Sequence, residues 1–224
     1  MKLFDRDIRL AIFDMDGTLI DSTSIWGDID REFFARRGKE VPPKYGETIS
    51  HMGLSKAAEW TRKNYLPEEK EEDIIQEWRD MSKHAYEKTI PLKLGAKEIL
   101  EALKEKGVRL ALATANSDDL YLPCLSRLGI LDYFESVKDV VKVKEGKNSS
   151  KIYDEIADEF NLSPNNIMVI EDILSALRVA KNAGYLSIGV YDEQSTKDIE
   201  TIKQNCDHFF YDLMEFVSMA KGLL

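Results

Sequence analysis

Short apolar runs alternate with helical patterns along most of the chain. The runs lie at 9–13, 108–113, 167–170 and 186–190, and each is largely apolar, without the regular polar alternation of a half-exposed strand. Such runs are typical of strands that are buried on both faces of a parallel sheet. Between them, apolar residues recur at the i, i+3, i+4 spacing over 95–107, 149–160 and 174–183, which predicts helices. The alternation predicts an α/β fold in which helices cover both faces of a parallel sheet.

One long segment, 22–89, carries only helical patterns. Within it, Pro67 and the acidic residues that follow suit a helix N-terminus, because proline fits the first helical turn and carboxylates favour the positive end of the helix dipole. We therefore expect a core domain made of 1–21 and 90–224, with an inserted α-helical cap domain at 22–89.

Composition and charge exclude several classes of protein. The chain has 224 residues, 43% of them apolar, which is enough for a core with a second lobe. A formal net charge of −10 disfavours nucleic acids and anionic membranes as partners, but it is compatible with a small anionic substrate. No segment has the apolar length of a membrane span, and the N-terminal residues are too charged for a secretory signal, so a cytoplasmic location is expected. No feature fixes the oligomeric state, for which a monomer is slightly favoured.

Reactive side chains follow directly after the predicted strands. They are Asp14 and Asp16 after the first strand, Thr114 and Asn116 after the second, Lys147 after a further apolar patch, and Glu171 with Asp172 after 167–170. In an open parallel sheet the ligand crevice lies at the carboxyl ends of the strands, so these side chains are expected to converge. Two carboxylates roughly 4 Å apart at an effective dielectric near 20 repel by about 4 kcal/mol. A divalent cation would offset that repulsion, and the oxygen donors predict Mg²⁺.

Each motif also has an ordinary structural interpretation. The segment 14–17 suits a turn, and Thr114 and Asn116 suit the cap of a following helix. Lys147 has other lysines close by in the sequence, and a surface lysine is ordinarily just solvated. The motifs favour a shared site because all of them occur together.

In this order and at these separations, the residues carry a family resemblance. Asp14-Met15-Asp16-Gly17-Thr18, Thr114-Ala115-Asn116, Lys147 and Glu171-Asp172 resemble the four motifs of the haloacid dehalogenase superfamily of phosphohydrolases. The insertion resembles the helical C1 cap of the subgroup that contains phosphoglycolate phosphatases and β-phosphoglucomutases. The resemblance covers nearly the whole chain. It implies a Rossmann-like core and a Mg²⁺-dependent phosphatase that acts on a small phosphorylated metabolite, such as a sugar phosphate or phosphoglycolate.

The resemblance also implies catalytic roles. Asp14 would attack phosphorus and form an aspartyl-phosphate, for which an ionised carboxylate needs no activating base. Asp16 would protonate the leaving oxygen and then accept a proton from the attacking water. Thr114 would donate its hydroxyl to the phosphoryl group, and Lys147 would balance the charge on its oxygens.

Binding roles follow from the same resemblance. Mg²⁺ would be held by Asp14, Asp172 and the main-chain carbonyl of Asp16, while Glu171 would orient a bound water. Residues implied to border the substrate are Gly17, Thr18, Ala115 and Asn116 in the core, with His51 and Lys56 in the cap.

Two places depart from the family pattern. Asn148-Ser149-Ser150 follow Lys147 where proline is usual, which puts the rigidity of that loop in doubt. Ile173 and Ala176 replace a common serine and glycine after Asp172, so a polar contact near the metal region is expected to be missing.

Other functions are compatible with parts of the pattern. A phosphosugar mutase of the β-phosphoglucomutase type ranks second, because such relatives tend to have valine or isoleucine where Thr18 stands. A dehalogenase is disfavoured, since those relatives lack a carboxyl group at the position of Asp16. A non-enzymatic alternative is a receiver-like switch that is phosphorylated on aspartate, but receivers are about half this length and have no helical insertion.

Overall fold

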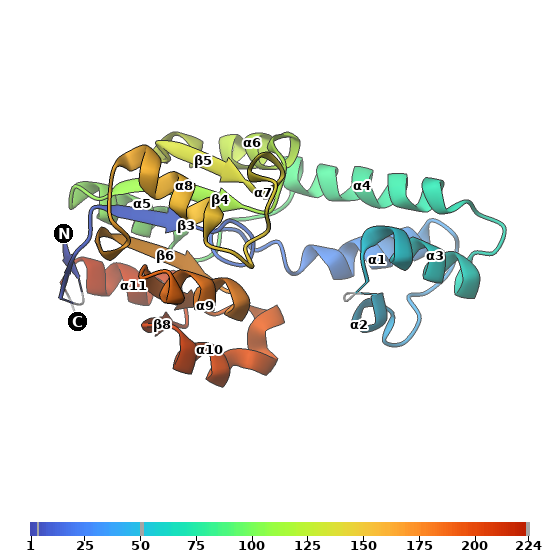
Figure 1. The fold of residues 1–224 in the computed structure, drawn as a ribbon. Coiled ribbons are helices and arrows are strands. Elements are labelled where there is room, and N and C mark those ends of the chain that lie inside the picture. The colour runs from blue at the N-terminus through green and yellow to red at the C-terminus, as the bar shows by residue number, and fades with distance from the viewer. Residues whose placement is uncertain (4, 50–51, 223–224) are drawn as a thin grey trace. The chain divides into compact units, whose positions relative to one another are not determined.

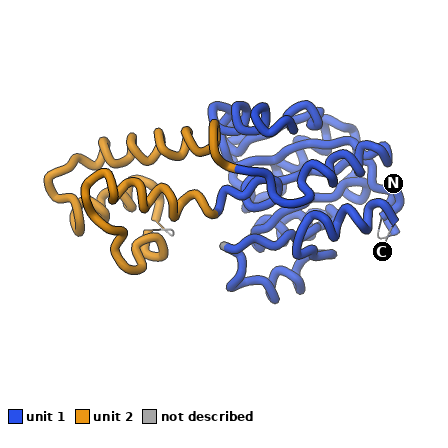
Figure 2. Tube along the Cα trace, turned by 180° about the vertical axis from the view of Figure 1, so that it is seen from behind, with its two compact units in different colours: residues 1–23, 91–224 blue, residues 24–90 orange. Residues whose placement is uncertain are grey.

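The computed structural model describes residues 1–3, 5–49 and 52–222, and the chain divides into two compact units. Unit 1 contains Met1–Thr23 and Pro91–Leu224, and unit 2 is Ser24–Ile90 (Figure 2). The insertion was expected at 22–89, so unit 2 begins two residues later and ends one residue later than expected.

Unit 1 is built on a parallel sheet of six strands in the order β5-β4-β3-β6-β7-β8 (Figure 1). The strands are β3 (Leu10–Phe13), β4 (Arg109–Thr114), β5 (Ser136–Asp139), β6 (Ile167–Glu171), β7 (Leu186–Val190) and β8 (His208–Phe210). Leu10 on the central strand β3 aligns with Arg109 and Ile167 on its two neighbours. The carboxyl ends of β3, β4 and β6 therefore reach the same edge of the sheet. The predicted parallel α/β fold is confirmed, although β5 and β8 were not foreseen.

Helices cover both faces of this sheet. Those of unit 1 are α5 (Ala96–Glu105), α6 (Asp118–Arg127), α7 (Val140–Val143), α8 (Lys151–Phe160), α9 (Leu174–Asn182), α10 (Ile199–Asn205) and α11 (Leu213–Ala220). Leu10 and Ile12 belong to the buried cluster that includes residues of α8. Side chains alternate along a strand, so Ala11 and Phe13 point to the opposite face of the sheet. Helices α5 and α11 pack on each other over that face (Figure 1).

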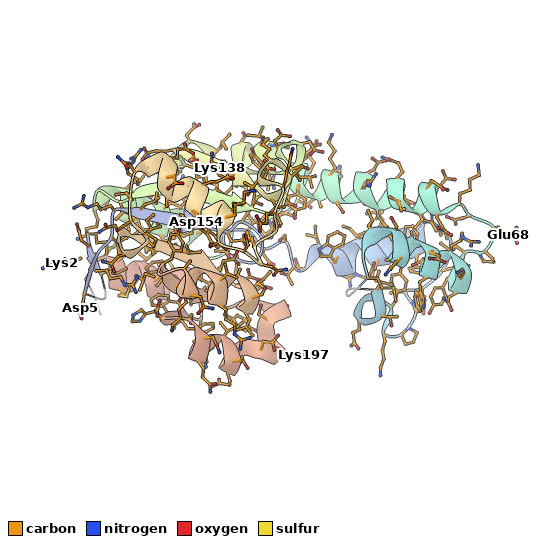
Figure 3. All side chains as sticks on the ribbon, viewed as in Figure 1. Lys2, Asp5, Glu68, Lys138, Asp154 and Lys197 are labelled. Carbon is orange, nitrogen blue, oxygen red and sulfur yellow. The ribbon has the colours of Figure 1, made fainter. Side chains whose placement is uncertain are left out.

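Polar contacts fix α8, the helix that follows Lys147. The Asp154 carboxylate accepts hydrogen bonds from the Ser150 hydroxyl at 2.7 Å and from the Tyr185 hydroxyl at 2.6 Å. At the edge of the sheet, Lys138 on β5 forms an ion pair with Glu159 at 2.9 Å (Figure 3 labels Lys138 and Asp154). The start of α8, and with it the preceding loop, is thereby tied to the sheet.

Unit 2 is helical within its described residues. It contains α1 (Ile25–Ala35), α2 (Tyr45–Ile49), α3 (Leu54–Tyr65) and α4 (Glu71–Lys88). Helix α4 begins at Glu71, so the expectation that Pro67 opens this helix is wrong, although three acidic residues do fill the first turn. Aromatic rings from all four helices pack together: Phe33, Phe34, Tyr45, Trp60, Tyr65 and Trp78.

Smaller features complete the described chain. A short antiparallel pair, β1 (Lys2–Leu3) and β2 (Arg6–Asp7), precedes the sheet. Both cysteines, Cys124 and Cys206, are buried free thiols. Across the residues that the structure describes, no helix has both the length and the apolar character that a membrane crossing requires.

A buried carboxyl group in unit 2 gives a testable pH dependence of stability. Burial raises the pKa of Asp30 to about 6, partly opposed by the charge of Arg31. Between pH 4 and 6 the folded chain then holds a proton that the unfolded chain releases, so this residue makes the free energy of unfolding fall as pH rises. We expect Asp30→Asn to raise the free energy of unfolding at pH 7.5 by about 2 kcal/mol and to leave it nearly unchanged at pH 4. Urea unfolding at both pH values measures this, and an equal effect at the two would contradict it.

Candidate active site

The loop after β3 folds back on itself in a tight turn. Its Gly17 N–H donates to the Ile20 carbonyl at 3.0 Å, and the Leu19 N–H donates to the Met15 carbonyl at 2.9 Å. Gly17 has φ +75°, and a Cβ atom at this position would lie 2.5 Å from Oδ2 of Asp172. A residue with a side chain is excluded by both the backbone angle and this contact. The glycine therefore lets the loop approach Asp172 closely.

Three buried carboxylates meet at the carboxyl ends of β3 and β6. Asp14 follows β3, while Glu171 ends β6 and Asp172 follows it. One oxygen atom from each lies within 4.8 Å of the others. Lys147 joins them, because its ammonium donates to Oδ1 of Asp14 and, at 2.7 Å, to Oε1 of Glu171. Four of the predicted residues thus form one contiguous group.

Burial and mutual repulsion shift the pKa values of this group. Burial, with the charge of Asp14, raises the pKa of Glu171 to about 7 despite the opposing effect of Lys147. Burial and the nearby carboxylates also raise the pKa of Asp172 well above its ordinary value. For Lys147, burial alone would lower the pKa, but Asp14 and Glu171 outweigh it and raise the pKa. The carboxylates crowd together more negative charge than the one ammonium offsets.

The donor set suits a divalent cation. Oε2 of Glu171 is buried, and no described residue forms a hydrogen bond with it. Three convergent carboxylate groups offer the hard oxygen donors that Mg²⁺ selects. Asp14, Glu171 and Asp172 therefore fit a Mg²⁺ ion. Asp16, the fourth metal-site residue expected from the sequence, is not part of this cluster.

Asp16 lies on the other side of the turn, with Asn116. The Asn116 amide donates to Oδ2 of Asp16 at 2.5 Å, which connects the loop after β3 with the loop after β4. Thr114 is buried at the end of β4, where its hydroxyl accepts the Asn116 N–H at 3.1 Å and contacts the Met15 sulfur at 3.9 Å. Thr18 is also buried, and its hydroxyl donates to Oδ1 of Asp172 at 3.4 Å.

Other contacts take the place of the expected family residues. The serines after Asn148 tie their own loop, since the Ser149 hydroxyl accepts the Lys151 N–H at 3.3 Å and Ser150 binds Asp154. Ile173 has a side chain that is 52% exposed and carries no polar group. A serine far along the chain, Ser195, donates to the Asp172 carbonyl at 2.9 Å. Ile173 and Ala176 supply no polar side chain here, as expected, but Ser195 provides a hydroxyl contact to Asp172 from another segment.

Several residues beside the cluster lie outside the motifs identified in the sequence. Tyr153 on α8 donates its hydroxyl to Glu171 at 3.4 Å, yet the helical pattern assigns it to the apolar core. Asp192 is buried two positions after β7 ends at Val190. Its position just after the apolar run 186–190 is the sequence signal that could have identified Asp192. No sequence signal distinguishes Ser195.

The contacts described above do not include the remaining predicted residues. Ala115 is exposed between Thr114 and Asn116. Lys56 is exposed on α3 of unit 2, and His51 lies outside the described residues. Their roles stay predictions.

Comparisons with known proteins place this arrangement in a family. The family model for haloacid dehalogenase-like hydrolases matches residues 11–190, which span the Asp14 loop, Lys147 and the Glu171–Asp172 pair. The chain belongs to the haloacid dehalogenase-like hydrolase family. The family resemblance seen in the motifs, and the prediction of a hydrolase, are confirmed.

Individual haloacid dehalogenase-like relatives agree with this assignment. A phosphorylated carbohydrates phosphatase of Thermotoga maritima is 30% identical over 79% of this chain and 82% of its own length. A phosphoglycolate phosphatase of Nitrosospira multiformis is 25% identical over 97% of this chain and 98% of its own. A Thermotoga maritima structure, provisionally assigned as a β-phosphoglucomutase, is similar in fold with a TM-score of 0.85 and 24% identity, covering 97% of this chain and 100% of that one.

The raised pKa of Glu171 predicts competition between protons and a divalent cation. Between about pH 4.5 and pH 7 the folded chain holds a proton that the unfolded chain has released, so without metal this group makes the chain less stable as pH rises. Mg²⁺ must displace that proton to bind. We expect 5 mM Mg²⁺, on the order of typical assay concentrations, to raise the melting temperature more at pH 8 than at pH 5.5.

Thermal melts with Mg²⁺ and with EDTA at both pH values measure this competition. The control is Glu171→Gln, which carries no titrating carboxyl group and should reduce the difference between the two pH values. Equal stabilisation by Mg²⁺ at both pH values in the unmodified chain would contradict the prediction.

Proposed function

We propose that the chain is a Mg²⁺-dependent phosphatase that hydrolyses a small phosphorylated metabolite through an aspartyl-phosphate intermediate. The observation that carries this proposal is the meeting of Asp14, Lys147, Glu171 and Asp172 at one edge of the sheet. A nucleophilic carboxylate, a fixed ammonium and an acidic metal site are the groups that such a reaction needs.

In the first half-reaction, a carboxylate oxygen of Asp14 attacks phosphorus and the bond from phosphorus to the leaving oxygen breaks. That oxygen takes a proton from Asp16 and departs as an alcohol. In the second, water attacks the phosphorus, its proton passes to Asp16, and the bond to Asp14 breaks to release inorganic phosphate. Asp16 suits both transfers because Asn116 holds its Oδ2 atom and so fixes the orientation of the carboxyl group.

The neighbouring residues would bind the phosphoryl group during these steps. Lys147 is held between Asp14 and Glu171, so its charge stands beside the nucleophile where charge spreads over the phosphoryl oxygens. The loop residues Gly17, Thr18, Thr114, Ala115 and Asn116 would border the group. Bound Mg²⁺, held by Asp14, Asp172 and Glu171 with the main-chain carbonyl of Asp16, would neutralise phosphate charge.

The names of three relatives support a substrate class for this chain. The Thermotoga maritima and Nitrosospira multiformis proteins are named for phosphorylated carbohydrates and phosphoglycolate, and a further relative in Escherichia coli is a hexitol phosphatase. All three names describe enzymes that act on small phosphorylated compounds. We propose that the substrate of this chain belongs to the same class, and a panel of such compounds would identify it.

Removal of the nucleophile tests the reaction. We expect Asp14→Asn to lower kcat for para-nitrophenyl phosphate by about a thousandfold or more, because an amide cannot form the acyl phosphate. Released phosphate is measured with Mg²⁺ and with EDTA. The control variant is Asp132→Asn, which changes a carboxylate far from the Asp14 loop in sequence and should keep full activity. Equal rates in Asp14→Asn and the unmodified chain, or no loss with EDTA, would overturn the proposal.

The proton transfer from Asp16 has a separate signature. We expect Asp16→Asn to lower kcat for a sugar phosphate by about a hundredfold or more. The loss should be smaller for para-nitrophenyl phosphate, because nitrophenolate leaves without taking a proton. The ratio of the two losses measures acid catalysis. Equal losses on both substrates would show that Asp16 acts in another way.

A further inference from the structure

A lysine outside all the predicted motifs donates a hydrogen bond to the main chain of the Asp14 loop. The Lys93 ammonium donates to the Gly17 carbonyl and the Tyr191 carbonyl, both at 2.6 Å, and to Oδ2 of Asp192 at 3.1 Å. Its side chain is only 18% exposed. All three donor hydrogens of the ammonium therefore have acceptors, which come from two different loops.

The backbone brings Lys93 to this position. Residues 91–93 run antiparallel to 19–21, with the Asp21 N–H donating to the Pro91 carbonyl and the Lys93 N–H donating to the Leu19 carbonyl. Lys93 thus lies where the chain re-enters unit 1, directly beside the turn that Gly17 makes.

Asp192 completes the arrangement from the end of β7. It is 3% exposed, and its Oδ1 atom accepts a hydrogen bond at 2.8 Å from the hydroxyl of Thr23. A Cβ atom added to Gly17 would lie 3.2 Å from Cγ of Asp192. The Lys93–Asp192 pair therefore lies directly beside Gly17, next to Asp172.

We propose that Lys93 is a positioning residue for the phosphatase reaction, acting through the Gly17–Thr18 peptide; this inference rests on the proposed function. A peptide group is planar, so fixing the Gly17 carbonyl also fixes the direction of the Thr18 N–H. Thr18 contacts Asp172, and Asp16 adjoins Gly17. One ammonium donates hydrogen bonds to the carbonyls of two separate loops. These bonds therefore hold Asp16, the proposed acid–base residue, and Asp172, a proposed metal ligand, in a fixed relative position.

A lysine elsewhere in unit 1 provides a matched comparison. Lys181 also forms an ion pair, with Asp207 at 3.0 Å, and donates to a main-chain carbonyl, that of Cys206, at 3.1 Å. It touches neither the Asp14 loop nor the end of β6 in the contacts described. Lys181→Met therefore controls for the loss of a lysine that has an ion-pair partner and a main-chain acceptor, with Lys181 the more exposed of the two at 40% against 18% for Lys93.

The first test compares kinetics. We expect Lys93→Met to lower kcat for para-nitrophenyl phosphate by at least about tenfold, with KM within about twofold, because displacement of catalytic groups lowers the rate more than it weakens binding. Lys181→Met should keep the full rate. Added ethylammonium should restore part of the rate to Lys93→Ala, which leaves space for it, but not to Lys93→Met. A kcat for Lys93→Met equal to that of Lys181→Met would overturn the inference.

The second test does not depend on activity. Amide hydrogen exchange at Gly17, Leu19 and Ile20 should be faster in Lys93→Met than in the unmodified chain or in Lys181→Met, because these N–H groups donate within the loop. Unchanged exchange would overturn the inference, whatever the kinetics. If the unmodified chain shows no phosphate release, the proposed function fails by itself, and exchange alone then decides whether Lys93 holds the loop.

Discussion

The repulsion among Asp14, Glu171 and Asp172 is the constraint on which the site depends. Their oxygens lie within 4.8 Å of one another in a buried position, where each pair of charges opposes folding by about 4 kcal/mol at an effective dielectric near 20. Lys147 compensates for part of this, since it contacts two of the three carboxylates. The rest requires protons or a cation. A bound divalent cation would relieve the same imbalance, which is why this group of carboxylates fits Mg²⁺.

The parallel sheet is what makes this crowding possible. Strands β3 and β6 are adjacent and in register, so Asp14 and the Glu171–Asp172 pair leave the sheet side by side although more than 150 residues separate them in sequence. The main-chain hydrogen bond from Asp14 to the Ile170 carbonyl extends the pairing one step beyond the strand. Backbone hydrogen bonds and the apolar core thus hold together charges that would separate if they were on flexible loops.

The sequence predicted what depends on local pattern and missed what depends on long-range geometry. Buried strands are recognised by apolar runs, and the residues after them by position, so Asp14, Glu171 and Asp172 were placed together. Lys147 was placed with them although the apolar residues before it, Val140–Val143, form helix α7 rather than a strand. Strands β5 and β8 were missed because their residues, such as Lys138 and His208, are not uniformly apolar. Asp16 was expected to bind the metal through its main-chain carbonyl, and its side chain accepts a hydrogen bond from Asn116. The turn over 14–17 was expected, but spacing within one motif cannot reveal the contact with Asn116, which lies 100 residues away in sequence.

Ile173 stands where related proteins commonly have a serine, and it shows that a polar contact depends on where a group lies in space rather than on its place in a motif. Ile173 cannot supply a hydroxyl, but Ser195 donates one to the Asp172 carbonyl from the loop after β7. That loop also carries Asp192, the partner of Lys93. The segment after β7 thus contacts Asp172 directly through Ser195, and it contacts the Gly17 turn through Lys93. A neighbouring strand end can supply the hydroxyl that the motif itself does not carry, because in a parallel sheet all these ends meet at the same edge.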